Sequence, residues 1–169
     1  MNAPDIRKAI DTLSATFSTD PGKARAKNAP ATAKLIDGLQ CEVTGPYNAR
    51  IVTDMPPAMG GAASGPNPGW FLRAALASCT ATAIAMRAAK LGITLDSLEL
   101  TVESESDARG LLGVGNISAA LGAVKTRVKI RGDAAPEVLR ELVQWGDAHS
   151  PVGCTLRQLS DCSLDVDVA

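Results

Sequence analysis

The sequence predicts an α+β fold in which antiparallel strands pack around one long central helix. Residues 67–92 are dominated by alanine and leucine, which favour helices, and carry no proline after the first turn. Before and after this stretch, apolar and polar residues alternate with the two-residue period of a half-buried strand. One long helix between two groups of strands, in a chain of 169 residues, predicts a single α+β domain.

The central helix is delimited by specific residues at both ends. Asn67 can cap its first turn, and Pro68 fits the first helical position, where a missing N–H costs nothing. Gly92 is suited to end the helix. Small residues of the helix itself occupy nearly every side of it, so we expect the helix to be buried. A cysteine on such a helix is most often a small apolar core residue. Cys79 lies in one apolar stripe at helical spacing, which consists of Leu72, Leu76, Cys79, Ala83 and Met86.

The expected strands lie on both sides of the helix. Residues 39–44 and 49–53 are predicted to form a hairpin through a Gly-Pro-Tyr-Asn turn. Two later strands, 98–103 and 124–131, have an acidic and a basic outer face, which favours antiparallel pairing of opposite charges. Residues 162–168 are expected to form an end strand. Cys41 and Cys162 fall on the apolar sides of their strands and are interpreted as core residues.

Three further helical segments complete the expected fold. Residues 5–17 have an amphipathic pattern, and a second helix is expected from Asp133 or Ala134 to about Asp147. A short helical turn begins at Ser150, because Ser-Pro supplies a cap and a first-turn proline, and Cys154 follows one turn later. The Pro- and Gly-rich stretch 54–66 is a loop, either functional or a plain connector. We expect residues 1–30 to be an N-terminal helix with its connector and residues 31–169 to be the domain.

Composition excludes several classes of function. The net charge is −1 without a basic run, which argues against nucleic acid as a partner. Four cysteines without a C-x-x-C pair and a single histidine predict neither a metal site nor a cofactor. No signal peptide is expected, and no segment is expected to span a membrane. The default expectation is a cytoplasmic protein with reduced thiols.

Four sequence features together resemble the OsmC/Ohr family of thiol-dependent peroxidases. They are the Gly60-Gly61 loop, the Asn67-Pro68 helix start, the Ala-Ala-Leu-Ala-Ser-Cys run ending at Cys79, and the turn beginning Ser150-Pro151-Val152. The resemblance covers residues 35–168 and identifies a divergent member. It implies an OsmC-like α+β fold built as an intertwined homodimer, with the long helix at its centre and sites formed between subunits.

The resemblance also implies a chemistry. In the family, the cysteine at the Cys79 position attacks an organic hydroperoxide, and a second cysteine in a Cys-Pro-Val turn then closes a disulfide. A lipoyl-type dithiol reduces some members. This chain departs from the pattern twice: Ser150 replaces the second cysteine, and Gly69 replaces a glutamate that helps to hold an arginine over the thiolate. Cys154 is the candidate to resolve the oxidised Cys79, and Arg50 is the candidate activating cation.

Two hypotheses about function follow. The chain reduces organic hydroperoxides with Cys79 and Cys154, in defence against oxidative stress. Alternatively, it is an OsmC-like dimer without peroxidase activity that serves as a binding or structural protein. The retained cysteines favour the first hypothesis and the missing glutamate favours the second. A hydrolase with His149 as base beside Ser150 or Cys154 is disfavoured, because the adjacent residues His149 and Ser150 of a helix or turn diverge.

Overall fold

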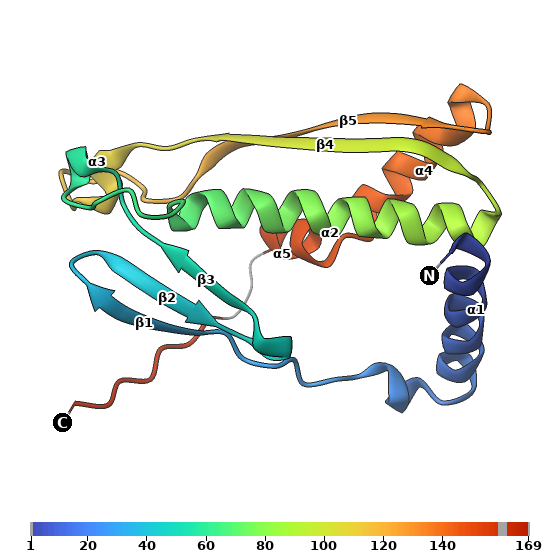
Figure 1. The fold of residues 1–169 in the computed structure, drawn as a ribbon, viewed down its shortest axis with the longest axis horizontal. Coiled ribbons are helices and arrows are strands. Elements are labelled where there is room, and N and C mark those ends of the chain that lie inside the picture. The colour runs from blue at the N-terminus through green and yellow to red at the C-terminus, as the bar shows by residue number, and fades with distance from the viewer. Residues whose placement is uncertain (1, 159–161, 169) are drawn as a thin grey trace. The chain divides into compact units, whose positions relative to one another are not determined.

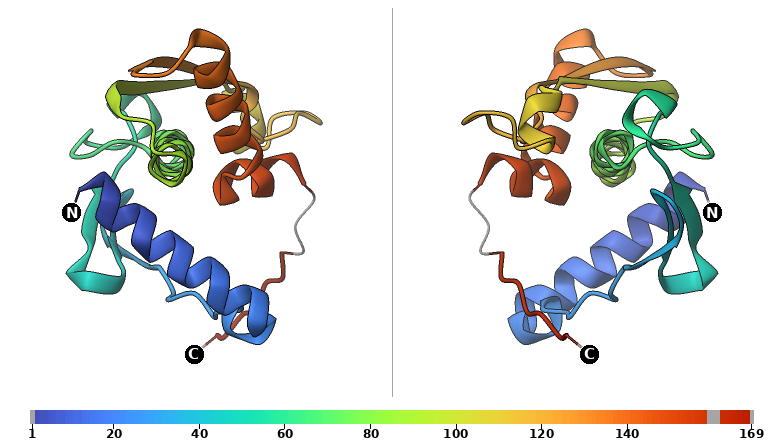
Figure 2. Two further views of the ribbon diagram at one scale, coloured as in Figure 1. Left: turned by 90° about the vertical axis from the view of Figure 1, so that its right-hand side faces the viewer. Right: turned by 90° about the vertical axis from the view of Figure 1, so that its left-hand side faces the viewer.

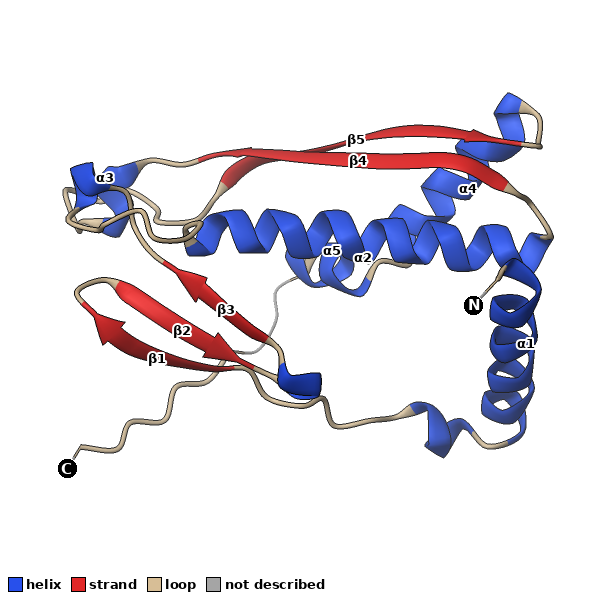
Figure 3. Ribbon diagram, in the orientation of Figure 1, coloured by secondary structure: helices blue, strands red, loops and turns tan. Residues whose placement is uncertain are grey.

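The computed structural model describes residues 2–158 and 162–168. Its elements run along the chain as Figures 1 and 3 show, with three short 3₁₀ turns between them: α1 (Ala3–Thr19), β1 (Thr32–Asp37), β2 (Gln40–Thr44), β3 (Arg50–Thr53), α2 (Pro68–Leu91), β4 (Leu95–Glu105), α3 (Ala108–Leu111), β5 (Gly122–Gly132), α4 (Pro136–Ala148) and α5 (Pro151–Arg157). The α+β class and the long helix are confirmed.

The chain divides into two compact units, which we describe separately. The first unit comprises Met1–Arg7, Leu76–Thr101 and Arg127–Ala169. The second unit comprises Lys8–Ala75 and Val102–Thr126.

The first unit contains the main hydrophobic core. Ile84 and Ala88 of α2 are buried against Leu139 and Leu142 of α4. The apolar faces of β4 and β5 pack on this cluster, and Figure 2, which looks along α2, shows α4 and α5 beside that helix. On the outer face of the two-stranded sheet, Lys129 Nζ lies 3.0 Å from Glu99 Oε1. The predicted alternation and the pairing of acidic with basic faces are thus confirmed.

The second unit contains a three-stranded antiparallel sheet in the order β1-β2-β3. The predicted hairpin is present: β2 pairs with β3 so that Cys41 lies opposite Thr53. The strand β1 was not predicted, because its sequence Thr-Ala-Lys-Leu-Ile-Asp does not alternate cleanly between apolar and polar residues. In the structure every residue of β1 is exposed. Cys41 is half-buried.

The C-terminal segment differs from the prediction. Residues 162–168 carry no strand, and Cys162 is exposed instead of buried in a core. Leu164 and Val166 are 85% and 71% exposed. The sequence of this segment does alternate between apolar and polar residues, but a strand also needs a neighbouring strand that supplies its hydrogen bonds.

The ends of α2 follow the predicted chemistry. Asn67 Oδ1 accepts a hydrogen bond from Trp70 N at 2.9 Å. Gly92 has a φ of +75°, and the following N–H, that of Ile93, donates to Ala88 O at 2.9 Å. A glycine at this position allows the left-handed conformation that ends a helix.

By length and composition, one described helix, Pro68–Leu91, is long and apolar enough to cross a membrane. No membrane span was expected from the sequence, and the two arginines of this helix do not bring its apolar character below that limit. A core helix passes the same test, and α2 contributes buried residues to the core of the first unit, so the result is weak evidence for a membrane span.

Candidate active site

Cys79 lies beside the buried stripe of α2, not within it. The buried residues of this helix are Leu76, Thr80, Ile84, Ala88 and Ala89. The prediction that Cys79 and Met86 lie on the buried side of α2 is wrong, since Met86 is 43% exposed and Cys79 is half-buried. A nearly uniform run of small residues gives little asymmetry from which to choose a face. Cys79 is thus neither a fully buried core residue nor a fully exposed one.

A hydrogen bond anchors the start of α5 to α2 immediately after Cys79. Thr80 Oγ1 donates to Ser150 Oγ at 3.1 Å, and both residues are almost completely buried. Ser150 is the N-cap of α5, as predicted, and its Oγ also accepts from Gly153 N at 3.3 Å. Ser150, which the sequence resemblance places where the family has its second cysteine, is thus a buried structural residue next to the Cys79 segment.

We expect Ser150→Ala to lower the free energy of unfolding by about 1–2 kcal/mol, because it removes a cap and leaves the buried Thr80 hydroxyl without this partner. Thr80→Val serves as the partner change, and urea unfolding of both single variants and the double variant measures their coupling. If the double variant loses the full sum of the two single losses, the hydroxyls do not stabilise each other.

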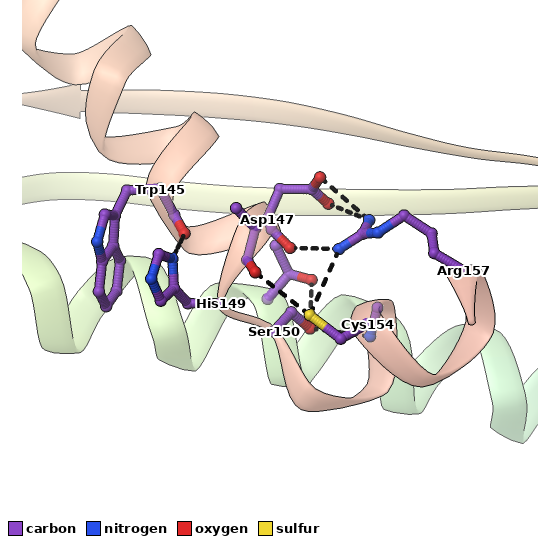
Figure 4. A network of polar contacts seen from close by, with 9 residues as sticks. Trp145, Asp147, His149, Ser150, Cys154 and Arg157 are labelled. Carbon is purple, nitrogen blue, oxygen red and sulfur yellow. Dashed lines mark hydrogen bonds and ion pairs between the residues drawn. The ribbon is translucent and has the colours of Figure 1, made fainter. Parts of the chain in front are cut away.

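Cys154 lies on the first turn of α5 and faces α4. Its Sγ donates to Ala148 O at 3.2 Å, and Arg157 Nη2 lies 3.9 Å from the same sulfur (Figure 4). Arg157 in turn contacts Asp147: Nη1 lies 3.1 Å from Oδ2, and Nη2 donates to the backbone oxygen at 2.6 Å. All four cysteines are unpaired thiols. The structure therefore places Cys79 and Cys154 in the same unit but not in a disulfide.

The predicted cation, Arg50, belongs to the second unit, whereas Cys79 belongs to the first. Arg50 is the first residue of β3, and its guanidinium forms an ion pair with Glu42 of the neighbouring strand. Another arginine, Arg73 near the start of α2, donates from Nη1 to Ser104 Oγ at 3.1 Å. Both arginines thus have partners other than a cysteine in this chain.

A buried carboxylate organises the Gly-rich loop before α2. Asp54 is only 2% exposed and accepts hydrogen bonds from the backbone of Met55, Ala62 and Ser64 and from the Ser64 hydroxyl. These bonds, those from Ser64 foremost, lower the pKa of Asp54 to about 2. A side chain at Gly61 would collide with the Met55 carbonyl, so the glycine permits the chain to pass close. The loop is therefore an ordered structure that delivers the chain to α2.

The first unit has an apolar groove, and Cys79 and Cys154 do not line it. Within residues 2–158 and 162–168, no group of three His, Cys, Asp or Glu side chains could hold a metal ion. A groove of about 700 Å³ lies in the first unit between β5 and α4, with an apolar floor that includes Val128 and Leu139. Its lining contains no cysteine, so the groove is separate from both Cys79 and Cys154.

Sequence reasoning missed Thr80, Asp147 and Arg157. The spacing of Cys154 and Arg157, three residues apart in a helix, was a usable signal for their proximity. The contact of Arg157 with Asp147 depends on the turn between α4 and α5 and could not be found from spacing.

The family model for OsmC-like proteins matches residues 61–165, which include α2, β4, β5, α4 and α5. The chain belongs to the OsmC-like protein family. The resemblance inferred from the sequence motifs is therefore confirmed. No curated protein matches this OsmC-like chain.

Solved structures of the family share the fold. An OsmC-like protein from Mycoplasma pneumoniae is 19% identical with a TM-score of 0.66, covering 79% of this chain and 89% of that one. An organic hydroperoxide resistance protein OsmC from Legionella pneumophila is 22% identical with a TM-score of 0.63, covering 79% and 91%. An OsmC-like protein of unknown function from Vibrio cholerae is 12% identical with a TM-score of 0.60, covering 77% and 94%. At such identities the likeness shows the fold alone.

Proposed function

We propose that this OsmC-like chain reduces organic hydroperoxides, with Cys79 as the nucleophile and Cys154 as the resolving thiol. The observation that carries the proposal is the buried bond between Thr80 and Ser150, which joins the segment of the second thiol to the residue after Cys79. The similarity to hydroperoxide resistance proteins supports the same chemistry.

The proposed reaction begins with attack of the Cys79 thiolate on the distal oxygen of the hydroperoxide. An S–O bond forms, the O–O bond breaks, and the leaving alkoxide takes a proton to become an alcohol. Cys79 is then a sulfenic acid, which the sulfur of Cys154 attacks to form a disulfide and release water. A dithiol of the lipoyl type is the proposed reductant of that disulfide. Arg50, which is 71% exposed, is the proposed activating cation and would have to leave Glu42 to act.

The resolving step requires α5 to move. Cys154 N donates to Ser150 O at 2.8 Å, so Cys154 lies one helical turn beyond Ser150, roughly 5–6 Å along the axis. A disulfide needs Cα atoms within about 7 Å of each other and converging side chains. The α5 helix has only 7 residues, and a helix this short unwinds readily.

The Cys154→Ser variant tests this function. After treatment with tert-butyl hydroperoxide, we expect its Cys79 to accumulate as sulfinic acid, because no second thiol traps the sulfenic acid. Peptide mass spectrometry measures the oxidation state, and Cys162→Ser, which removes an exposed thiol elsewhere, is the control. Equal rates of sulfinic acid formation in Cys154→Ser and the unaltered chain would show that Cys154 does not resolve Cys79.

A second candidate is an OsmC-like dimer without peroxidase activity, serving as a binding or structural protein. One observation favours it: Arg50 is paired with Glu42. The sequence resemblance favours it as well, because it implies a glutamate at position 69, and Gly69 offers no carboxylate to hold an arginine over the Cys79 thiolate. This candidate predicts that the hydroperoxide consumes none of the four thiols.

Either candidate is proposed to act as an obligate homodimer. The chain exposes many large apolar side chains, among them Leu35 at 62% and Val168 at 90%. A single chain that left these in water would be a poor stable monomer. We expect light scattering at micromolar concentration to give twice the chain mass of 17.4 kDa, and a monomeric mass would contradict the proposal. The unpaired thiols support a reducing, cytoplasmic location.

A further inference from the structure

The groove of the first unit lies where α4 follows the end of β5. β5 ends at Gly132 and α4 begins at Pro136, so the two elements diverge from one short turn (Figure 1). The groove volume of about 700 Å³ is within the range of about 300–1,000 Å³ that small-molecule sites have. Its size therefore suits a small organic molecule. Four apolar side chains from the two elements form the floor: Val128, Ile130, Leu139 and Val143.

The floor of the groove is apolar surface that the core leaves partly uncovered. Leu139 belongs to the buried cluster of the first unit. The other three floor residues pack against that cluster and are only half-buried. A hydrocarbon chain that covered them would remove apolar surface from water, which is favourable. The core holds these side chains in place, so the floor exists without a ligand.

Charged side chains line the same groove. Arg131 of β5 and Asp96 of β4 are exposed, and neither side chain forms an ion pair or a hydrogen bond with another residue that the structure describes. Arg140 of α4 also lines the groove, and its Nη1 lies 3.0 Å from Oε1 of Glu137 in an exposed ion pair. The groove therefore has two guanidinium groups against one carboxylate, and the guanidinium of Arg131 is without a described partner.

An apolar floor beside an excess of guanidinium groups is complementary to an amphipathic anion. A guanidinium presents paired N–H groups in one plane, which match the two oxygens of a carboxylate. We propose that the groove binds a free medium-chain carboxylate, with its hydrocarbon chain on the floor and its carboxylate on Arg131. Asp96 repels such an anion and lowers its affinity. The inference goes beyond peroxide reduction, since neither Cys79 nor Cys154 lines the groove.

Isothermal titration calorimetry of the full chain with decanoate at neutral pH tests the inference. We expect one decanoate to bind per chain and octanoate to bind about four- to sixteenfold more weakly, because it buries two fewer methylene groups. Arg131→Gln should weaken decanoate binding at least about threefold, and Asp96→Asn should strengthen it up to about threefold, since water screens both exposed charges. Decyltrimethylammonium has the same chain and a positive charge, so the two variants should change its affinity in the opposite directions.

The matched controls are Lys129→Gln and Glu99→Gln. They remove the same charges from the same two strands, but Lys129 and Glu99 pair with each other on the outer face of the sheet and do not line the groove. Both controls should keep the decanoate affinity within about twofold, because exposed charges away from a site contribute little.

Three results would overturn the inference. The first is no binding of decanoate up to about 1 mM, which leaves no specific affinity. The second is a decanoate affinity in Arg131→Gln that equals that of Lys129→Gln or exceeds that of the unaltered chain. The third is a fall in the mass measured by light scattering when decanoate is added, which would show that a second copy of the chain covers the groove.

Discussion

Replacement of Cys79 by serine is expected to abolish the consumption of organic hydroperoxide by this protein. The thiolate is the nucleophile of the proposed reaction, and a serine hydroxyl at neutral pH cannot replace it. We expect the rate of tert-butyl hydroperoxide loss, with dihydrolipoamide as reductant, to fall by at least about 100-fold, as is usual when a nucleophile is removed.

The control for this loss is Cys41→Ser. Cys41 is also half-buried, but it lies in β2 and has no place in the proposed reaction. Its replacement should leave the peroxide rate within about twofold of the unaltered protein, since a change outside the reacting groups leaves their transition state intact. If Cys41→Ser loses as much activity as Cys79→Ser, or if Cys79→Ser keeps its activity, the assignment of the nucleophile is wrong.

Replacement of Gly146 by alanine is expected to destabilise the protein strongly. A Cβ on Gly146 would overlap Ile84 Cγ1 and lie 3.0 Å from Ile84 N and 3.2 Å from Ile84 Cα. The side chain can turn away, but the backbone of α2 cannot. Alanine gains about 1 kcal/mol over glycine inside a helix, so the overlap must cost more than that to dominate. We expect a net loss of about 1–3 kcal/mol in the free energy of unfolding.

Urea unfolding of Gly146→Ala beside Gly122→Ala measures the effect. A Cβ at Gly122 would meet nothing within 4 Å, so that variant adds the same methyl group without overlap. Gly122→Ala should keep the stability of the unaltered chain to within about 1 kcal/mol. A Gly146→Ala protein at least as stable as the original would show that α4 and α2 do not approach each other this closely.

The regular elements could be predicted because their signals are local. The Asn67-Pro68 start and Gly92 end of the long helix, and the alternation in β4 and β5, each arise from neighbouring residues. Prediction failed where the structure of a segment depends on whether another segment pairs with it. The exposed strand β1 exists because β2 pairs with it, and residues 162–168 have strand alternation but no strand in this chain.

The candidate site was predictable only in part, for the same reason. Cys79 was found through a family motif and Cys154 through its place four residues after Ser150, and their roles stay proposals. The buried side of α2 was misjudged because alanines point in every direction, and burial follows the position of α4. The contact of Arg157 with Asp147 exists because the turn at Ser150 folds α5 back toward the end of α4, which no periodicity encodes.

The most direct test of the central claim is a disulfide map of the unaltered protein after one equivalent of tert-butyl hydroperoxide. Non-reducing digestion and mass spectrometry identify which cysteines have joined. We expect one product, a Cys79–Cys154 disulfide, with Cys41 and Cys162 still reduced. Four reduced thiols after complete mixing, or a disulfide that omits Cys79, would contradict the proposed chemistry.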